Sequence, residues 1–169
     1  MIRIYKFSEQ WRGYFEKEKA ILLNALKGYK IDKVEHIGAT SVVLCNTAGT
    51  IDLLLSIPSK MDMFTIKNIL LRQGYLYNDS MSNNDVFLFY RKDKNNNVLS
   101  TIRLVEFASE TYNNIKLFKF YLKEKDEHVI KYNEFRYSLA TTCHGDYAEY
   151  EKGKKAYIES IIERNNSNN

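Results

Sequence analysis

The chain has 169 residues and a formal net charge of +4, with 44% hydrophobic and 27% charged residues. These values are typical of one globular domain with a buried core, and we expect a single domain over residues 1–169. The charge is too small, and the basic residues too dispersed, to predict nucleic-acid binding. No apolar run predicts a membrane span, and two isolated cysteines predict neither a disulfide framework nor a zinc site, so we expect a reducing cytoplasm.

The predicted elements begin with a helix and two strands. Apolar residues recur at helical spacing over residues 8–27, and β-rich runs cover residues 33–37 and 50–57. Between the two runs, residues 39–49 are small and polar, which predicts a loop with at most one helical turn. A second helix is predicted over residues 61–72.

A hairpin and three helices complete the predicted order. β-rich runs over residues 86–91 and 98–107 flank a polar turn at Lys94–Asn97. Helical periodicity then returns in three segments, which are residues 110–125, 126–140 and 146–164. Strands grouped with helices in this order predict an α+β domain with a C-terminal helical portion.

A glycine after the first strand and an acid in the second mark the candidate site. Residues 34–41 read Val-Glu-His-Ile-Gly-Ala-Thr-Ser, so Gly38 follows a short strand, and Asp52 lies in the next one. Glycine permits close backbone approach, and N–H groups after it can face a phosphate. An acid on the neighbouring strand can hold the Mg²⁺ that a nucleoside triphosphate brings. This is the layout of a nucleotidyltransferase, but the second carboxylate that such sites need two residues on is replaced by Leu54.

Strand alternation sorts the other candidates between two faces. Asp52 shares a face with Leu54, and in the hairpin strand Thr101 and Arg103 point to the side of the site. Arg103 is a candidate for a phosphate contact, or it simply pairs with Asp52. Glu106 falls on the opposite face, so it serves as a second metal ligand only if a bulge turns it.

Several polar side chains keep two interpretations open. His36 is a general base or a hydrogen-bond donor to a phosphate, or it is a hydrogen-bonded residue that supports the strand end. Asp52 binds metal, or it caps a turn or pairs with a cation, because an unpaired acid in an apolar strand is costly to bury. Ser41 lacks the context of a nucleophile, and no P-loop or GxGxxG motif occurs. A solvated helix face is predicted for three lysines at helical spacing, Lys116, Lys119 and Lys123.

Three segments carry motifs that match one known family. Residues 35–42 read Glu-His-Ile-Gly-Ala-Thr-Ser-Val, and residues 51–53 read Ile-Asp-Leu. They resemble the E-H-I-G-S-T-S-V and I-D-I motifs of the GrpB-like family, a branch of the nucleotidyltransferase superfamily. In the C-terminal part, residues 117–123, 132–140 and 150–154 resemble that family's L-F-R-D-Y-L-R, Y-A-x-L-K-x-x-L-A and Y-x-x-G-K. The resemblance covers residues 8–164 and implies a nucleotidyltransferase-like mixed sheet flanked by helices.

The resemblance also implies a set of functional residues. Gly38, Thr40 and Ser41 would face a nucleotide phosphate, and Asp52 would hold Mg²⁺. The full predicted set comprises catalytic Asp52 and His36, nucleotide-binding Gly38, Thr40, Ser41, Arg103 and Lys154, and metal-binding Asp52 and Glu106. The implied partners are a nucleoside triphosphate and a small-molecule acceptor.

Departures from the family pattern concentrate at polar positions of the site. Ala39 stands in place of a serine, and Thr101 and Arg103 stand in place of two histidines. Two functions of the site therefore stay open. One is a Mg²⁺-dependent nucleotidyltransferase that acts on a small molecule, and the other is a catalytically inactive module of the same fold that binds a nucleotide or metabolite. A third function, an RNA or protein interaction domain that uses the basic, tyrosine-rich C-terminal helices, is supported only by their charge.

Overall fold

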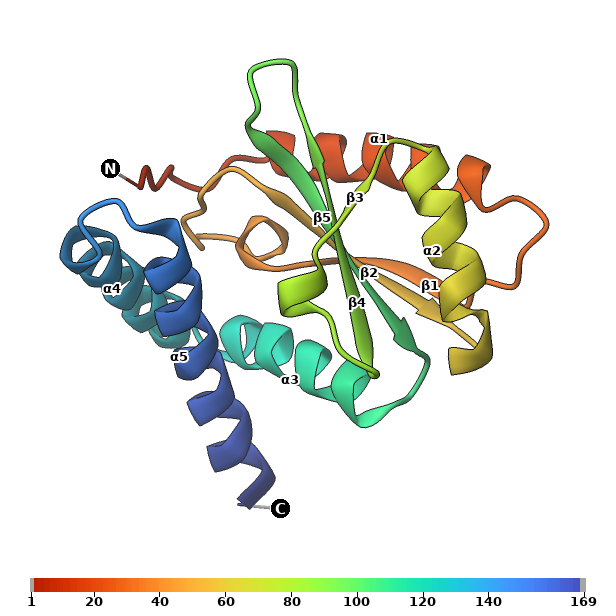
Figure 1. The fold of residues 1–169 in the computed structure, drawn as a ribbon. Coiled ribbons are helices and arrows are strands. Elements are labelled where there is room, and N and C mark those ends of the chain that lie inside the picture. The colour runs from red at the N-terminus through yellow and green to blue at the C-terminus, as the bar shows by residue number, and fades with distance from the viewer. Residues whose placement is uncertain (1, 168–169) are drawn as a thin grey trace.

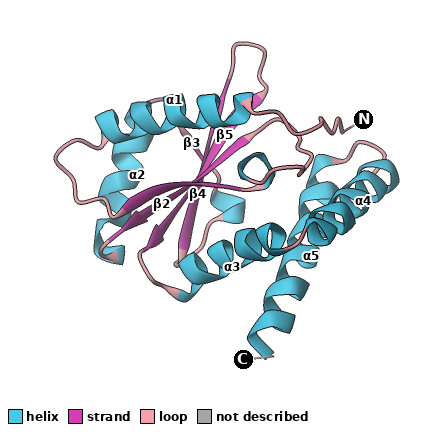
Figure 2. Ribbon diagram, turned by 180° about the vertical axis from the view of Figure 1, so that it is seen from behind, coloured by secondary structure: helices cyan, strands magenta, loops and turns pink. Residues whose placement is uncertain are grey.

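The computed structural model describes residues 2–167 and places a five-stranded sheet between two layers of helices (Figure 1, Figure 2). Its strands are β1 (Lys33–Ile37), β2 (Ile51–Ile57), β3 (Leu76–Tyr77), β4 (Val86–Lys92) and β5 (Val98–Glu106). They lie in the order β1-β2-β5-β4-β3. The β2–β5 pair is parallel and the other pairs are antiparallel, so the sheet is mixed, as predicted.

Five α-helices lie within residues 2–167. Helices α1 (Gln10–Ala25) and α2 (Met63–Arg72) cover one face of the sheet, and α3 (Glu110–Glu124) lies on the other (Figure 2). Helices α4 (Asp126–Thr142) and α5 (Tyr147–Ser167) pack on α3 and on each other, to one side of the sheet (Figure 1). The predicted α+β class and C-terminal helical portion are confirmed. Within this part of the chain, no helix has both the length and the apolar character needed to cross a membrane.

Alternation along β2 divides the apolar core between the two faces of the sheet. Four of its side chains pack under α1 and α2, namely Ile51, Leu53, Leu55 and Ile57. Leu54 points the other way, is fully buried, and packs with Val105 and Tyr112 beneath α3. The position where a second carboxylate was expected is therefore part of the core that holds α3.

A buried acid fixes α1 over the sheet. Glu18 is only 5% exposed. Its Oε1 accepts hydrogen bonds from Tyr75 Oη at 2.7 Å, from Ser100 Oγ at 2.8 Å and from Arg91 Nε at 2.9 Å. A buried carboxylate is costly unless it is paired and hydrogen-bonded, and here both conditions hold. Glu18 therefore ties α1 to strands β4 and β5.

Candidate functional site

The end of β1 brings Gly38 against the side chain of Asp52. Ile37 pairs with Asp52 across the antiparallel β1–β2 ladder, so Gly38 is the first residue beyond that pair. Its backbone angles, φ +69° and ψ −174°, belong to a region that is essentially restricted to glycine. A Cβ at this position would lie 2.1 Å from Asp52 Oδ2. The site thus needs a glycine both for its backbone angles and for the space that the carboxylate occupies.

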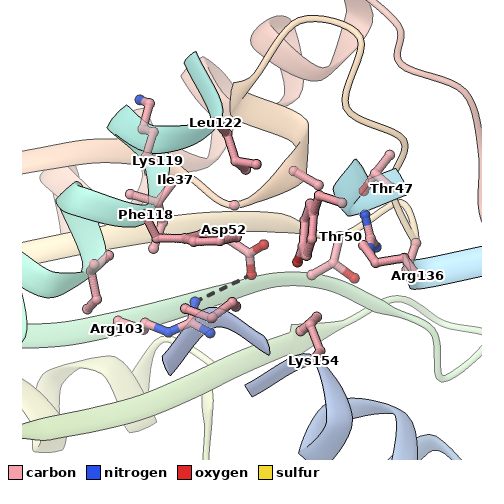
Figure 3. Close-up of a pocket in the computed structure, with 16 residues that line it drawn as sticks. Ile37, Thr47, Thr50, Asp52, Arg103, Phe118, Lys119, Leu122, Arg136 and Lys154 are labelled. Carbon is pink, nitrogen blue, oxygen red and sulfur yellow. Dashed lines mark ion pairs between the residues drawn. The ribbon is translucent and has the colours of Figure 1, made fainter. Parts of the chain in front are cut away.

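Two residues of β5 hold the Asp52 carboxylate. Thr101 Oγ1 donates a hydrogen bond to Asp52 Oδ1 at 2.5 Å. Arg103 Nη1 lies 3.8 Å from the same oxygen (Figure 3). The parallel register explains both contacts, because it sets Thr101 opposite Asp52 and Arg103 two residues further along the same face. The interpretation that Arg103 pairs with Asp52 is confirmed.

In the turn after Gly38, the hydroxyl groups of Thr40 and Ser41 hydrogen-bond to backbone carbonyls. A single 3₁₀ turn spans Ala39–Ser41. The Ser41 side chain donates to the Gly38 carbonyl at 2.7 Å, and the buried Thr40 hydroxyl donates to the Thr50 carbonyl at 3.4 Å. Gly38 and Ala39 line the adjacent cavity, whereas Thr40 and Ser41 do not. The structure therefore gives the two hydroxyls a role in shaping the turn.

His36 lies on the face of the sheet opposite to Asp52. Its ring stacks on Phe15 of α1, with centroids 4.5 Å apart and planes 3° from parallel. Its Nε2 lies 2.9 Å from Thr40 Oγ1, within hydrogen-bond distance. Burial and the nearby Lys119 ammonium lower the pKa of His36 to about 4, so the ring is neutral at pH 7. Strand alternation thus directs His36 away from the predicted catalytic site.

Glu106 is also not brought to Asp52. The β2–β5 ladder runs without interruption from Ser100 to Glu106, so no bulge turns the strand. Glu106 pairs with Ile57, five residues beyond the Asp52 pair, or roughly 16 Å along the strand. Its carboxylate accepts a hydrogen bond from the Lys60 backbone at 3.3 Å. The geometry therefore separates the two predicted metal ligands.

The residues around Asp52 do not fit a Mg²⁺ ion held by the protein alone. Within residues 2–167, no group of three or more His, Cys, Asp or Glu side chains is arranged to hold a metal. Leu54 is buried, and one oxygen of Asp52 already interacts with Thr101 and Arg103. Mg²⁺ takes six oxygen ligands in near-octahedral geometry, which this environment does not supply.

Two cavities lie beside Asp52, and three side chains line both of them: Asp52, Arg103 and Lys154. The first, which we name the inner chamber, has a volume of about 150 Å³ and lies between the end of β1 and helices α3, α4 and α5. The second, which we name the outer groove, has a volume of about 380 Å³ and is bounded by β4, β5, α5 and the turn at Asp79–Met81. Its lining includes three tyrosines, Tyr77, Tyr90 and Tyr147.

The charges of the two cavities differ. The outer groove is balanced, with three cations and three carboxylates: Lys92, Arg103, Lys154, Asp52, Asp79 and Glu151. The inner chamber has one carboxylate and four cations: Asp52, Arg103, Lys119, Arg136 and Lys154. An excess of positive charge in a concave, partly apolar site attracts anions. The inner chamber and its boundary with the groove therefore favour an anionic ligand.

Two cations of the chamber were not predicted as site residues from the sequence. Lys119 was expected on a solvated face, but its Nζ donates to the His36 carbonyl at 2.6 Å, and burial lowers its pKa. Arg136 of α4 is 3% exposed and donates through Nε to Tyr150 Oη at 2.9 Å. The four-residue spacing of Tyr132, Arg136 and Ala140 on the buried face of α4 is the signal that could have identified Arg136.

Lys154 reaches the cavities because α5 lies close to α4. A Cβ at Gly153 would lie 2.7 Å from Leu139 Cδ1, so this glycine permits the close approach of the two helices. The next residue, Lys154, then lines both cavities and pairs with Glu151 at 2.5 Å. In Figure 3, Lys154 lies on α5 below Asp52 and Arg103. Of the five predicted nucleotide-binding residues, Gly38, Arg103 and Lys154 line the inner chamber.

This architecture is that of the nucleotidyltransferase-like fold, with a glycine turn after one strand and an acid in its neighbour. The model of the GrpB protein family matches residues 1–164. The chain therefore belongs to the GrpB family.

Solved structures show the same fold. The chain is similar to the crystal structure of conserved protein GrpB from Enterococcus faecalis, with a TM-score of 0.82, 23% identity and 96% of each chain covered. It is also similar to the Cid1 poly(U) polymerase bound to Mg 3′-dATP, with a TM-score of 0.51, 15% identity and 88% of this chain covered. That match covers 49% of the polymerase, so the chain spans about half its length. A search of curated proteins finds no match.

Proposed function

We propose that this chain binds a nucleotide, or a similar phosphorylated metabolite, at the junction of the outer groove and the inner chamber. The observation that carries the proposal is the position of Arg103 and Lys154, which line both cavities beside Asp52. Phosphate groups at this junction would face both cations. Arginine and lysine are the usual protein ligands of phosphate.

The outer groove suits the rest of such a ligand. Its volume of about 380 Å³ lies within the range of small-molecule sites. Tyr77, Tyr90 and Tyr147 offer aromatic surface and hydroxyl groups, to which a base or another planar group can bind. The groove has no excess of positive charge and the chamber has one, which favours a ligand orientation with the phosphates toward the chamber.

Binding would not require a metal held by the protein. Arg103 already offsets the charge of Asp52, so a phosphate that approaches this pair meets little net repulsion. The proposal thus corresponds to a module of the nucleotidyltransferase-like fold that binds its ligand without metal chemistry.

Mg²⁺-dependent nucleotidyl transfer to a small-molecule acceptor is the second candidate function. It is favoured by Asp52, which lies beside Gly38 at the position that the family resemblance gives to a metal ligand. The Cid1 structures of the same fold, bound to Mg 3′-dATP and to MgGTP, agree with it. It requires the ligand phosphates and water to supply nearly all the Mg²⁺ ligands, because the protein offers one carboxylate.

Calorimetric titration of the four ribonucleoside triphosphates, with Mg²⁺ and with EDTA, separates the two functions. We expect at least one triphosphate to bind in EDTA, and we expect Lys154→Met to weaken it about tenfold or more. Lys155→Met is the matched control, since Lys155 is the next residue but its side chain is 71% exposed. Asp52→Asn should preserve or strengthen binding, because it removes a negative charge.

Other results would change the conclusion. Binding that needs Mg²⁺, that disappears in Asp52→Asn and that accompanies pyrophosphate release would favour the transferase. Folded wild-type protein that binds no triphosphate under either condition would refute both functions as stated for nucleoside triphosphates.

A further inference from the structure

We infer that the inner chamber is a second binding site, which takes a small organic carboxylate. The apolar body of this ligand fills the chamber, and Arg136 binds its carboxylate. The site is distinct from the proposed nucleotide site, because Arg136 lines the chamber and not the outer groove.

Arg136 carries a positive charge that no carboxylate of the described residues balances. The residue is 3% exposed, and among residues 2–167 no carboxylate forms an ion pair with it. Its guanidinium donates to two neutral oxygens, Tyr150 Oη and the Asn46 carbonyl, and lies 5.4 Å from the Tyr132 ring centroid. A buried cation without a counter-charge costs several kcal/mol. A bound anion would remove this cost.

The guanidinium of Arg136 also has hydrogen-bond donors to offer a ligand. A guanidinium carries five N–H donors in a planar fork, and two are used by the oxygens of Tyr150 and Asn46. These two contacts also hold the side chain in place between α4, α5 and the loop before β2. A carboxylate matches the spacing of the fork and accepts two parallel hydrogen bonds. Arg136 is therefore both available to a carboxylate and fixed in position.

The size and lining of the chamber suit a compact ligand with an apolar body. Its volume of about 150 Å³ equals that of a protein cavity that binds benzene, and it is too small for a nucleoside. Apolar side chains from α3 and α5 line it, namely Ile115, Phe118, Leu122 and Ile158; Phe118 and Leu122 are labelled in Figure 3. Such walls suit a ligand with a small hydrocarbon body better than a hydrated inorganic anion. The chamber thus selects a compact acid with an aromatic or branched aliphatic body.

Ligand-observed NMR titration tests the inference with two acids and their neutral amides. We expect benzoate or isovalerate to bind, and we expect benzamide and isovaleramide to bind at least tenfold more weakly, since they lack the charge. Arg136→Met should weaken acid binding tenfold or more. Lys131→Met is the control, because Lys131 is on the same helix with a side chain that is 59% exposed.

A second variant tests the same site in case Arg136→Met does not fold. Ile158→Phe puts a larger side chain into the chamber and so reduces its free volume, without changing a residue that contacts the guanidinium. It should block acid binding in protein that melts cooperatively. Equal binding of acid and amide, or unchanged acid binding in folded Ile158→Phe or Arg136→Met, overturns the inference, as does wild-type protein that binds neither acid. None of these results depends on nucleotides, so triphosphate binding can fail while the acid site stands, and the reverse.

Discussion

Replacement of Gly38 by alanine tests whether the carboxylate of Asp52 occupies the space beside the glycine. The added Cβ would lie 2.1 Å from Asp52 Oδ2 and 2.9 Å from its Cγ. A non-glycine residue at φ +69° and ψ −174° costs about 1–3 kcal/mol of backbone strain. Overpacking against a fixed neighbour costs about 1–3 kcal/mol more. The expected loss of unfolding free energy is therefore about 2–6 kcal/mol.

Gly28→Ala is the matched control for the backbone contribution. Gly28 has a φ of +93°, and a Cβ there meets nothing within 4 Å. The left-handed conformation alone costs about 1–2 kcal/mol. Equilibrium urea denaturation, followed by circular dichroism, measures both variants, and an excess cost at Gly38 is expected from the overlap with Asp52.

A double-mutant cycle locates the overlap. Asp52→Ala removes the Oδ2 and Cγ atoms that meet the new Cβ, so Gly38→Ala should cost about 1–3 kcal/mol less in that background. The reasoning is refuted if Gly38→Ala costs no more than Gly28→Ala. It is refuted equally if the coupling between positions 38 and 52 is zero.

Three further predictions concern the packing around the site. Glu18→Ala should lower the unfolding free energy by about 3–5 kcal/mol in urea denaturation, because it leaves Arg91 partly buried without its partner. Glu16 is exposed, so Glu16→Ala should cost under about 0.5 kcal/mol, and equal costs would contradict the role of the buried network. His36 should titrate near pH 4 by ¹H NMR, and a midpoint near 6.5 would show an exposed ring instead. Since folding lowers its pKa from 6.5, the unfolding free energy should fall by up to about 1.4 kcal/mol per pH unit as the pH drops from 6.5 toward 4. Leu54→Asp should lower the unfolding free energy by about 3 kcal/mol or more, because it places a charge in the buried cluster beneath α3. Retained stability together with new Mg²⁺ binding would show instead that the fold accepts a second carboxylate at this position.

The elements with clear periodicity could be predicted from the sequence. The long helices and the strands β1, β2, β4 and β5 lie within a few residues of their expected positions. β3 has only two residues, which is too short for any alternation to show. Alternation along a single strand also predicted the direction of Arg103 and Glu106, because it needs no knowledge of the neighbouring strands.

The site depends on contacts that no local pattern reveals. The side of the sheet that His36 faces follows from its pairing with Leu53, which is known only once β1 is placed beside β2. The burial of Arg136 follows from its contact with the Asn46 carbonyl, 90 residues away in the chain. Charged residues on an amphipathic helix usually face solvent, so the sequence alone favoured the wrong interpretation for Lys119 and gave no reason to single out Arg136.

The departures at positions 54 and 103 form one electrostatic change. A site with two carboxylates carries a charge of about −2, which a bound Mg²⁺ neutralises before phosphates approach. Here the position of the second carboxylate is taken by the buried Leu54. Arg103 lies 3.8 Å from Asp52 and stands where the family pattern has a histidine, which is mostly neutral at pH 7 because its usual pKa is about 6.5. The Asp52–Arg103 pair is therefore close to electrically neutral. The two-carboxylate site becomes neutral only when Mg²⁺ is bound. A ligand phosphate meets the same balance of charge without Mg²⁺, which is the physical reason to expect triphosphate affinity that EDTA leaves unchanged.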